Sequence, residues 1–161
     1  MEFVSEYLSP FGKMIMASDG TCLTGLWFQD QKYFPDNLPT QQHELPVFDD
    51  VRNWLDVYFD HKEPGYIPTL KLTGTDFQKE VWNILCTIPY GKTVTYGEIA
   101  AQIAEMRGIP RMSSQAVGGA VGRNRISIIV PCHRVIGADG SLTGYAGGIG
   151  IKSELLKLER N

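Results

Sequence analysis

The stretch KEPGYIPTLKLTGT, residues 62–75, divides the chain into two halves with different hydrophobic patterns. Proline and glycine interrupt both helices and strands, so a segment rich in them is typical of a linker. Apolar residues alternate before this stretch, as in short strands, and recur at helical spacing after it. We therefore expect an α/β (α+β) fold, with an N-terminal domain over residues 1–72 packed on an α-rich C-terminal domain over residues 73–161.

The N-terminal half predicts a small sheet and one helix. Three short runs with apolar alternation, FVSEYLS, GKMIMASD and CLTGLWFQD, are separated by the turn signals Pro-Phe-Gly and Asp-Gly, which together predict an antiparallel β-meander. The next segment, LPVFDDVRNWLDVYFDHK, predicts an amphipathic helix, because its apolar residues recur every three or four positions. These residues are Val47, Val51, Trp54, Leu55 and Tyr58.

The C-terminal half predicts mainly helices. One should begin at Thr75 or Asp76 and include Cys86, and a second, in TYGEIAAQIAEMRG, should end at Gly108. A short third helix, SSQAVGGAVG, should begin after a serine N-cap. Helix, short glycine-containing turn and helix form the layout of a helix-turn-helix. After them we expect SIIV, residues 127–130, to form a short buried strand that ends at Pro131.

The third predicted helix is unusually poor in side chains, since it contains Ala116, Gly118, Gly119 and Ala120. A helix that reads bases in the major groove needs long polar side chains. This helix could instead pack closely against another helix. Alternatively, its smooth surface could let the backbone approach a nucleic-acid groove with little sequence discrimination.

The charge of the chain is unevenly distributed. The net charge is −3, but residues 1–72 hold five Lys and Arg against eleven Asp and Glu, whereas residues 73–161 hold ten against seven. No acidic residue occurs from Met106 to Ala138, a segment with five arginines: Arg107, Arg111, Arg123, Arg125 and Arg134. Such a segment forms either a solvated face or a surface that binds a polyanion.

Several classes of protein are disfavoured by composition. The N-terminus has no basic and apolar signal-peptide pattern, and no apolar stretch is long enough to cross a bilayer, so we expect a cytoplasmic protein without membrane attachment. The cysteines (Cys22, Cys86 and Cys132) and the histidines (His43, His61 and His133) are few and widely spaced. We therefore expect no disulfide framework and no metal site.

The segment IVPCHRVIG places Cys132 beside His133. Neighbouring side chains of an extended segment point to opposite faces, so we expect a water molecule to bridge the thiol and the imidazole. A histidine base also needs an orienting carboxylate, for which Asp139, Glu154 and Glu159 are the downstream candidates. Spacing selects none of them, and an inert buried cysteine is the alternative interpretation.

Five segments resemble the O6-alkylguanine-DNA alkyltransferases. They are FQKEVWNILCTIPYGKTVTYGEIA, AVGGAVGRN, IVPCHRVIG, GYAGG and KSELLKLE, and they run in this order from Phe77 to Glu159. The resemblance implies DNA repair by direct reversal, in which Cys132 takes the alkyl group from O6-alkylguanine in double-stranded DNA. It implies a single, self-inactivating turnover without any cofactor. Whether O4-alkylthymine is also a substrate is left open.

The resemblance also implies roles for individual residues. His133 would take the Cys132 proton through water, Glu159 would orient His133, and Asn124 would act as a hinge. Tyr96 would assist base flipping and contact the guanine. The base pocket would be lined by the carbonyls of Val130 and Cys132 and by Leu142, Tyr145, Ala146 and Gly147. The residues expected to contact DNA are Arg111, Ser114, Gln115, Ala116, Gly118, Arg123 and Arg134.

Gln115 departs from the family pattern. The family commonly has an arginine at this position, which fills the space left by the flipped base. Glutamine brings no charge, so we expect weaker or more salt-tolerant DNA binding.

Two other functions are weighed against this one. A lesion-binding protein without a nucleophile is disfavoured by the presence of Cys132. A cysteine hydrolase or acyltransferase using Cys132, His133 and Glu159 would turn over repeatedly, whereas an alkyltransferase takes up one alkyl group per molecule. We expect a monomer.

Overall fold

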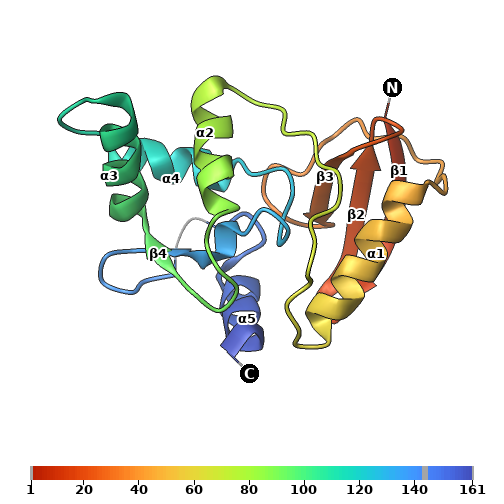
Figure 1. The fold of residues 1–161 in the computed structure, drawn as a ribbon. Helices are drawn as coiled ribbons and strands as arrows, with labels where there is room; N and C mark the ends of the chain where they lie inside the picture. The colour runs from red at the N-terminus through yellow and green to blue at the C-terminus, as the bar shows by residue number, and fades with distance from the viewer. Residues whose placement is uncertain (1, 143–144, 161) are drawn as a thin grey trace.

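The computed structural model of the chain describes residues 2–142 and 145–160. A three-stranded sheet with one long helix forms the N-terminal half, and a group of helices forms the C-terminal half (Figure 1). The last helix lies below the other C-terminal elements in this view, close to the region where the two halves meet. The α+β architecture expected from the sequence is confirmed.

The N-terminal sheet is the predicted β-meander. Its strands β1 (Phe3–Ser9), β2 (Gly12–Ser18) and β3 (Leu23–Phe28) pair antiparallel in the order β1-β2-β3. Helix α1 (Pro46–Phe59) follows, with Pro46 in its first turn and a buried apolar face that includes Val51, Trp54 and Tyr58. This face packs into the main hydrophobic core together with the sheet residues Met14, Met16 and Leu26.

The C-terminal half contains four α-helices among the described residues: α2 (Asp76–Leu85), α3 (Tyr96–Arg107), α4 (Ser114–Gly122) and α5 (Ile149–Arg160). Thr75 and Thr95 form capping boxes at the starts of α2 and α3, and Gly108 ends α3 in the left-handed conformation. Strand β4 (Val94–Thr95) pairs in parallel with β5 (Val135–Ile136). Helices α3 and α4 are the helix pair that the sequence predicts.

Two predictions about local structure are wrong. Residues 127–130 form consecutive turns instead of a buried strand, although Ile126 makes one isolated bridge to Leu26. A short apolar run shows only that a segment is buried, and these residues are buried without forming a strand. Helix α2 ends at Leu85, so Cys86 caps the helix and is only partly buried.

Strand β3 joins the two halves through backbone hydrogen bonds. The Leu26 N–H donates to the Arg125 carbonyl at 2.8 Å, and the Ser127 N–H donates to the Leu26 carbonyl at 2.9 Å. The other end of β3 bonds to the linker, where the Leu23 N–H donates to the Thr69 carbonyl at 2.8 Å. No helix within the described ranges is long and apolar enough to cross a membrane.

Candidate active site

Tight turns present Cys132 to the interior of the protein. Ile128 has a φ of 70°, which is rare for a β-branched residue, and the Ile129 N–H donates across it to the Ser127 carbonyl at 2.8 Å. Pro131, at φ −83° and ψ 65°, forms an inverse γ-turn in which the Cys132 N–H donates to the Val130 carbonyl at 2.8 Å. A single 3₁₀ turn, η1 (Cys132–Arg134), follows and buries Cys132.

The Asn124 side chain holds these turns together. Its Nδ2 donates to the Val130 carbonyl at 2.8 Å and to the Ile126 carbonyl at 3.1 Å, while its Oδ1 accepts from the Ile126 N–H at 3.0 Å. Asn124 is 6% exposed, so these bonds satisfy polar groups that water does not reach. These bonds tie the end of α4 to the turns that lead to Cys132.

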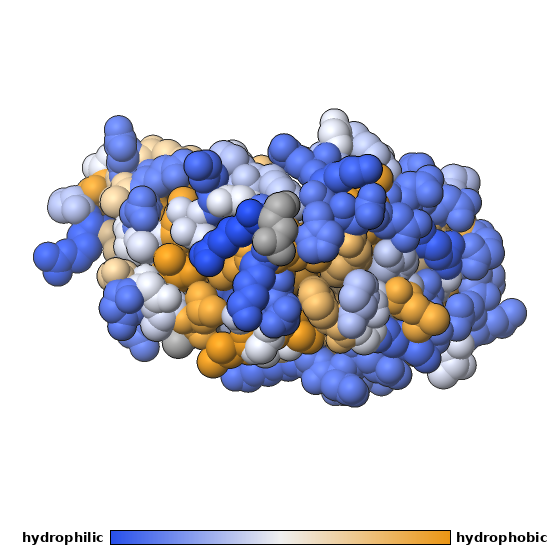
Figure 2. Space-filling model, turned by 90° about the horizontal axis from the view of Figure 1, so that it is seen from below, coloured by the Kyte–Doolittle hydropathy of each residue, from blue (hydrophilic) through white to orange (hydrophobic). Residues whose placement is uncertain are grey.

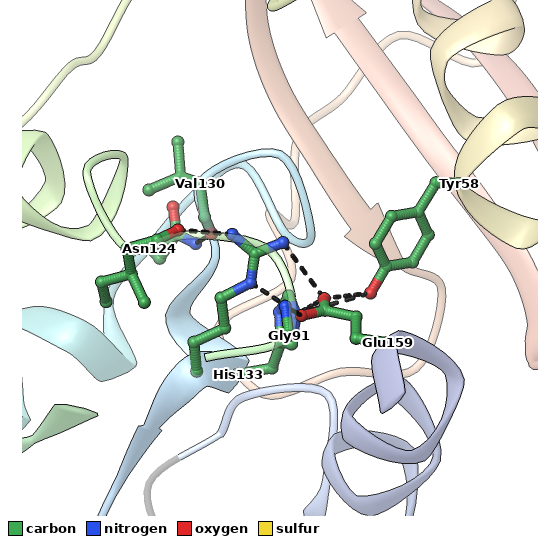
Figure 3. Close-up of polar contacts among 8 residues, drawn as sticks. Tyr58, Gly91, Asn124, Val130, His133 and Glu159 are labelled. Atoms are coloured by element: carbon green, nitrogen blue, oxygen red, sulfur yellow. Dashed lines mark hydrogen bonds and ion pairs between the residues drawn. The ribbon is translucent and has the colours of Figure 1, made fainter. Parts of the chain in front are cut away.

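Glu159, on α5, is the centre of a buried polar cluster (Figure 3). Its Oε2 accepts from His133 Nε2 at 2.5 Å and from the Tyr58 hydroxyl at 2.6 Å, and an Arg134 guanidinium nitrogen lies 3.2 Å away. Its Oε1 accepts from Arg134 Nε at 2.9 Å and from the Gly91 N–H at 3.1 Å. Burial alone would raise the pKa of Glu159, but the hydrogen bonds and charges of His133 and Arg134 lower it to about 2.

The surroundings of His133 favour its uncharged form. Burial lowers its pKa, and the positive charges of Arg134 and Lys152 act in the same direction, against the opposing effect of Glu159. Because Nε2 faces the Glu159 carboxylate, we assign the imidazole proton to Nε2. Nδ1 then carries the free lone pair, and it is buried with no hydrogen-bond partner in the part of the chain that the structure describes.

The Cys132 thiol is protonated at physiological pH. Burial raises its pKa to about 11, although the Asn124 side chain and the Lys152 ammonium group favour the thiolate. Lys152 is itself fully buried on α5, and burial lowers its pKa to about 8 against the opposing effect of Cys132. The thiol therefore needs a base to become nucleophilic, and a buried cation is present to stabilise the resulting anion.

A hollow of about 520 Å³ adjoins this cluster. Its walls come from α4, from the loop before α5 and from the N-terminal half, and its lining residues are Lys32, Tyr33, Gly118, Gly119, Gly122, Tyr145, Ala146, Gly148 and Ile149. Seen from below, the molecule has a group of hydrophobic side chains on its C-terminal half, bordered by hydrophilic surface (Figure 2). Most of the residues that line the hollow are glycine or alanine, so its wall consists mainly of backbone and small side chains.

Two of the predicted pocket residues, Tyr145 and Ala146, line this hollow. Tyr145 is buried, and its ring meets that of His133 edge to face at 6.5 Å between centroids. A side chain at Gly147 would collide with Tyr145, because its Cβ would lie 2.6 Å from Cε2 of that ring. Ala146 is held by the Lys32 N–H, which donates to its carbonyl at 2.9 Å. Leu142 is partly buried, whereas residues 143 and 144 of the predicted pocket segment lie outside the described residues.

Tyr96 begins α3 and lies between two other elements. An added Cβ at Gly118 of α4 would be in ordinary contact with its ring at 3.8 Å, and the Lys152 ammonium group lies 5.9 Å from the ring centroid. A methyl group at position 118 would therefore fit against the Tyr96 ring without any shift.

Most of the predicted DNA-contacting side chains are exposed on one side of α4. Ser114, Gln115 and Ala116, in its first turn, are exposed, as is Arg111 before the helix. Arg123, just after α4, is also exposed, and its guanidinium carbon lies 3.9 Å from the centroid of the Tyr33 ring. The first turn of α4 and the residues just before and after the helix thus carry exposed side chains, while Val117, Ala120 and Val121 of the same helix are buried.

Two predicted roles need correction. Arg134 is not placed to bind DNA, because it is buried, pairs with Glu159 and donates to the Ile88 carbonyl at 2.8 Å. The Val130 carbonyl already accepts two hydrogen bonds, from Asn124 and from the Cys132 N–H. A carbonyl has two lone pairs, so the predicted bond from the guanine amine would have to displace or share one of these two bonds.

Two residues of the site were missed by sequence reasoning. Tyr58 has the spacing of a core residue in α1, and Lys152 has that of a solvated residue near the start of α5. No local signal identifies either, because their neighbours in the site come from distant parts of the chain. In the described ranges, no group of three or more His, Cys, Asp or Glu side chains is arranged to hold a metal ion.

Two family models match the chain. The model described as 6-O-methylguanine DNA methyltransferase, DNA binding domain, matches residues 76–161, and the one described as 6-O-methylguanine DNA methyltransferase, ribonuclease-like domain, matches residues 4–65. The boundary predicted near residue 72 falls between the two matched ranges.

Similar proteins and structures support the same assignment. The methylated-DNA–protein-cysteine methyltransferase from Methanosarcina mazei is 54% identical over 95% of this chain and 94% of its own length. The one from Haemophilus influenzae is 42% identical over 98% of this chain and 86% of its own length. The crystal structure of the Mycobacterium tuberculosis O6-methylguanine methyltransferase is 44% identical, covers 99% of this chain and 93% of that one, and has a TM-score of 0.84. A structure of Mycobacterium tuberculosis OGT in complex with DNA covers 99% and 92%, at 42% identity and a TM-score of 0.81. The chain therefore belongs to the 6-O-methylguanine DNA methyltransferase family.

Proposed function

We propose that the protein repairs O6-alkylguanine in double-stranded DNA by moving the alkyl group to Cys132 in a single turnover. The observation that carries this function is a buried Cys132 that directly precedes the Glu159-paired His133 and interacts electrostatically with Tyr145, which lines the hollow. The names of the relatives, which are methylated-DNA–protein-cysteine methyltransferases, support the same chemistry.

The reaction begins with removal of the thiol proton. His133 accepts it at Nδ1 through a bridging water, and the imidazolium is stabilised by Glu159. The Cys132 thiolate then attacks the alkyl carbon, forming an S–C bond while the C–O6 bond breaks. The electron pair passes to the guanine, which takes up a proton and leaves as the normal base. The thioether is stable, so each molecule acts once.

The base reaches the thiol by flipping out of the duplex, because a buried thiol cannot reach a stacked guanine. Tyr96 contacts the flipped base, and Leu142, Tyr145, Ala146 and Gly147 form its pocket. The Ala146 N–H donates to O6, a role that needs only backbone and is helped by the hydrogen bond that fixes the Ala146 carbonyl.

The exposed side of α4 approaches the DNA. Gln115 fills the space left by the flipped base, the small residues Ser114, Ala116 and Gly118 allow the helix backbone close to a groove, and Arg111 and Arg123 contact phosphates. The crystal structure of a homologue with DNA supports a DNA-binding role for this fold.

The proposal also covers the oligomeric state, the compartment and the domain boundary of the protein. The protein works as a monomer in the cytoplasm, without a cofactor, and its two domains meet near residue 72. A DNA substrate and three free cysteines are in keeping with a reducing compartment.

Intact-mass analysis tests the proposed reaction. After mixing with a duplex containing O6-methylguanine, each protein molecule should gain one CH₂ unit, mapped to Cys132, and the Cys132→Ala variant should gain nothing. The Cys22→Ala and Cys86→Ala variants are matched controls that should still gain one. Repeated turnover with protein of unchanged mass would instead indicate a hydrolase and would refute the proposal.

A further inference from the structure

Tyr58 reaches the reactive cluster from the N-terminal half of the molecule. It lies in the last turns of α1 and is fully buried. Its ring stacks on Trp54 at 5.4 Å between centroids with planes 9° apart, and meets Tyr90 edge to face at 6.1 Å. These contacts from two elements fix the direction of the hydroxyl group, which points toward Glu159 (Figure 3).

The hydroxyl group contacts the carboxylate oxygen that holds His133. It donates to Glu159 Oε2 at 2.6 Å and lies 3.4 Å from His133 Nε2. No other described side chain of the N-terminal half hydrogen-bonds to Glu159 or His133. Burial and the adjacent Glu159 charge raise the pKa of Tyr58 far above its usual value, so the hydroxyl stays a donor at any pH the protein meets.

Three donors share Oε2: His133 Nε2, the Tyr58 hydroxyl and an Arg134 guanidinium nitrogen. Each hydrogen bond that the oxygen accepts lowers its basicity toward the others. Among the described side chains that contact the carboxylate, Tyr58 is the one neutral group apart from the imidazole itself. Its removal would therefore change the hydrogen bonding of Glu159 without changing the net charge of the cluster.

We propose that Tyr58 is a positioning residue for alkyl transfer. It fixes the Glu159 carboxylate and weakens the hydrogen bond between this carboxylate and His133. The inference rests on the proposed role of His133 as the base for Cys132. The N-terminal domain then takes part in the chemistry, because a hydroxyl group from α1 completes the hydrogen bonding of the Glu159 carboxylate, which orients His133.

Several titratable and charged groups surround the Tyr58 hydroxyl, and an experiment must distinguish the effect of the hydroxyl from theirs. Glu159 and Arg134 face the hydroxyl from α5 and η1, His133 faces it from η1, and Tyr90 and Tyr145 lie on adjoining loops. In Tyr58→Phe all of these groups remain, while Oε2 loses one donor. The carboxylate then interacts more strongly with the Nε2 proton, which raises the pKa of His133.

The test is the pH profile of single-turnover methyl transfer from an O6-methylguanine duplex, from about pH 5.5 to about pH 9. In Tyr58→Phe the rate at neutral pH should fall roughly tenfold, the size of one hydrogen bond to a charged group. The acid limb should move up by roughly one pH unit, because more of His133 is protonated at a given pH. Duplex affinity, measured in a Cys132→Ser background, should stay unchanged.

Tyr7→Phe is the matched control. Its hydroxyl donates to Asp56 on the same helix as Tyr58 at 2.7 Å, away from Glu159, so the variant loses an equivalent Tyr–carboxylate hydrogen bond. It should keep the pH profile of the parent protein. Replacing Tyr58 with 3-fluorotyrosine keeps the ring and makes the hydroxyl a stronger donor, so it should move the acid limb the opposite way, to lower pH.

The inference is overturned if Tyr58→Phe loses thermal stability but keeps both the rate per folded molecule and the position of the acid limb. Should Tyr58→Phe fail to fold, an unmoved limb in the fluorotyrosine protein would overturn it equally. His133→Gln distinguishes this failure from that of the proposed function. If the acid limb persists in His133→Gln, the role of His133 as base is wrong, whereas a limb that depends on His133 but not on Tyr58 removes only this inference.

Discussion

The Lys152 ammonium group lies 5.9 Å from the centroid of the Tyr96 ring and within the electrostatic influence of the Cys132 thiol. It is fully buried, so its charge acts through a medium of low polarity, where charges interact more strongly than in water. One buried cation thus interacts with two parts of the site. The first is the Tyr96 ring, which we expect to contact the flipped base, and the second is the Cys132 nucleophile.

Removing this charge should make Cys132 less acidic. In Lys152→Met the pKa of the Cys132 thiol should rise, because the thiolate loses a favourable charge, and the thiolate fraction at a given pH should fall in proportion. The measurement is the rate of iodoacetamide alkylation against pH, in a background where Cys22 and Cys86 are serine. Lys157→Met, an exposed lysine on the same helix, is the control and should leave the rate unchanged. An equal rate in both variants would contradict a role for Lys152.

Loss of the Asn124 amide should destabilise the Cys132 turn. Asn124→Ala removes three hydrogen bonds and leaves the buried Ile126 N–H without its acceptor, so the free energy of unfolding should fall by about 2–3 kcal/mol. Urea denaturation measures this, and methyl transfer should also be lost because the turn that presents Cys132 is no longer fixed. Asn53→Ala, at an exposed position of α1, should change stability little. A similar small loss in Asn124→Ala would rule out the hinge role.

Stability should decrease in acid because of the buried cluster. The pKa of His133 is lowered from 6.5 and that of Glu159 from 4.5 to about 2, so in both cases the unfolded chain binds more protons than the folded one over the intervening pH range. The contribution of these two groups to the free energy of unfolding should therefore be fully present above about pH 6.5 and should be lost progressively as the pH falls toward 2. Urea titrations at several pH values test this. Glu159→Gln should show a shallower decline, and a curve parallel to that of the parent protein would contradict the assignment.

Gln115 should set the salt dependence of DNA binding. Gln115→Arg adds one positive charge at the exposed start of α4, so affinity should rise and the slope of log K against log salt should become steeper by about 1. Arg111→Gln should change the slope by about the same amount in the opposite direction. If Gln115→Arg leaves both affinity and slope unchanged, Gln115 does not contact the DNA.

The sequence could predict those parts of the fold that local patterns encode. Alternation and turn signals predicted β1, β2 and β3, the start signal at Thr75 or Asp76 predicted where α2 begins, and Gly108 predicted where α3 ends. The buried run at residues 127–130 was predicted as a strand, because apolar composition reports burial and does not distinguish a strand from turns. Its turns depend on Asn124, whose hydrogen bonds no hydrophobic pattern predicts.

The site could be predicted only where residues match the family pattern. The His133–Glu159 contact, which the resemblance implied, is present, but Arg134 was grouped with the exposed arginines because a run without acidic residues does not show which side chain points inward. Tyr58 and Lys152 lie far from Cys132 in sequence or lack any distinguishing spacing. Their positions follow from how the two halves pack, which is a property of the whole chain.

The pairing of β3 has a further consequence for how the molecule avoids aggregation. An unpaired strand edge is a template for association with other chains. Here the outer edge of β3 is covered in turn by the linker at Thr69 and by residues 125–127, and the outer edge of β1 is partly covered where the His43 N–H donates to the Val4 carbonyl at 3.0 Å. The halves cannot separate without exposing the unpaired edge of β3, so the bonds that cover this edge also hold together the two halves that bring Tyr58 to Glu159.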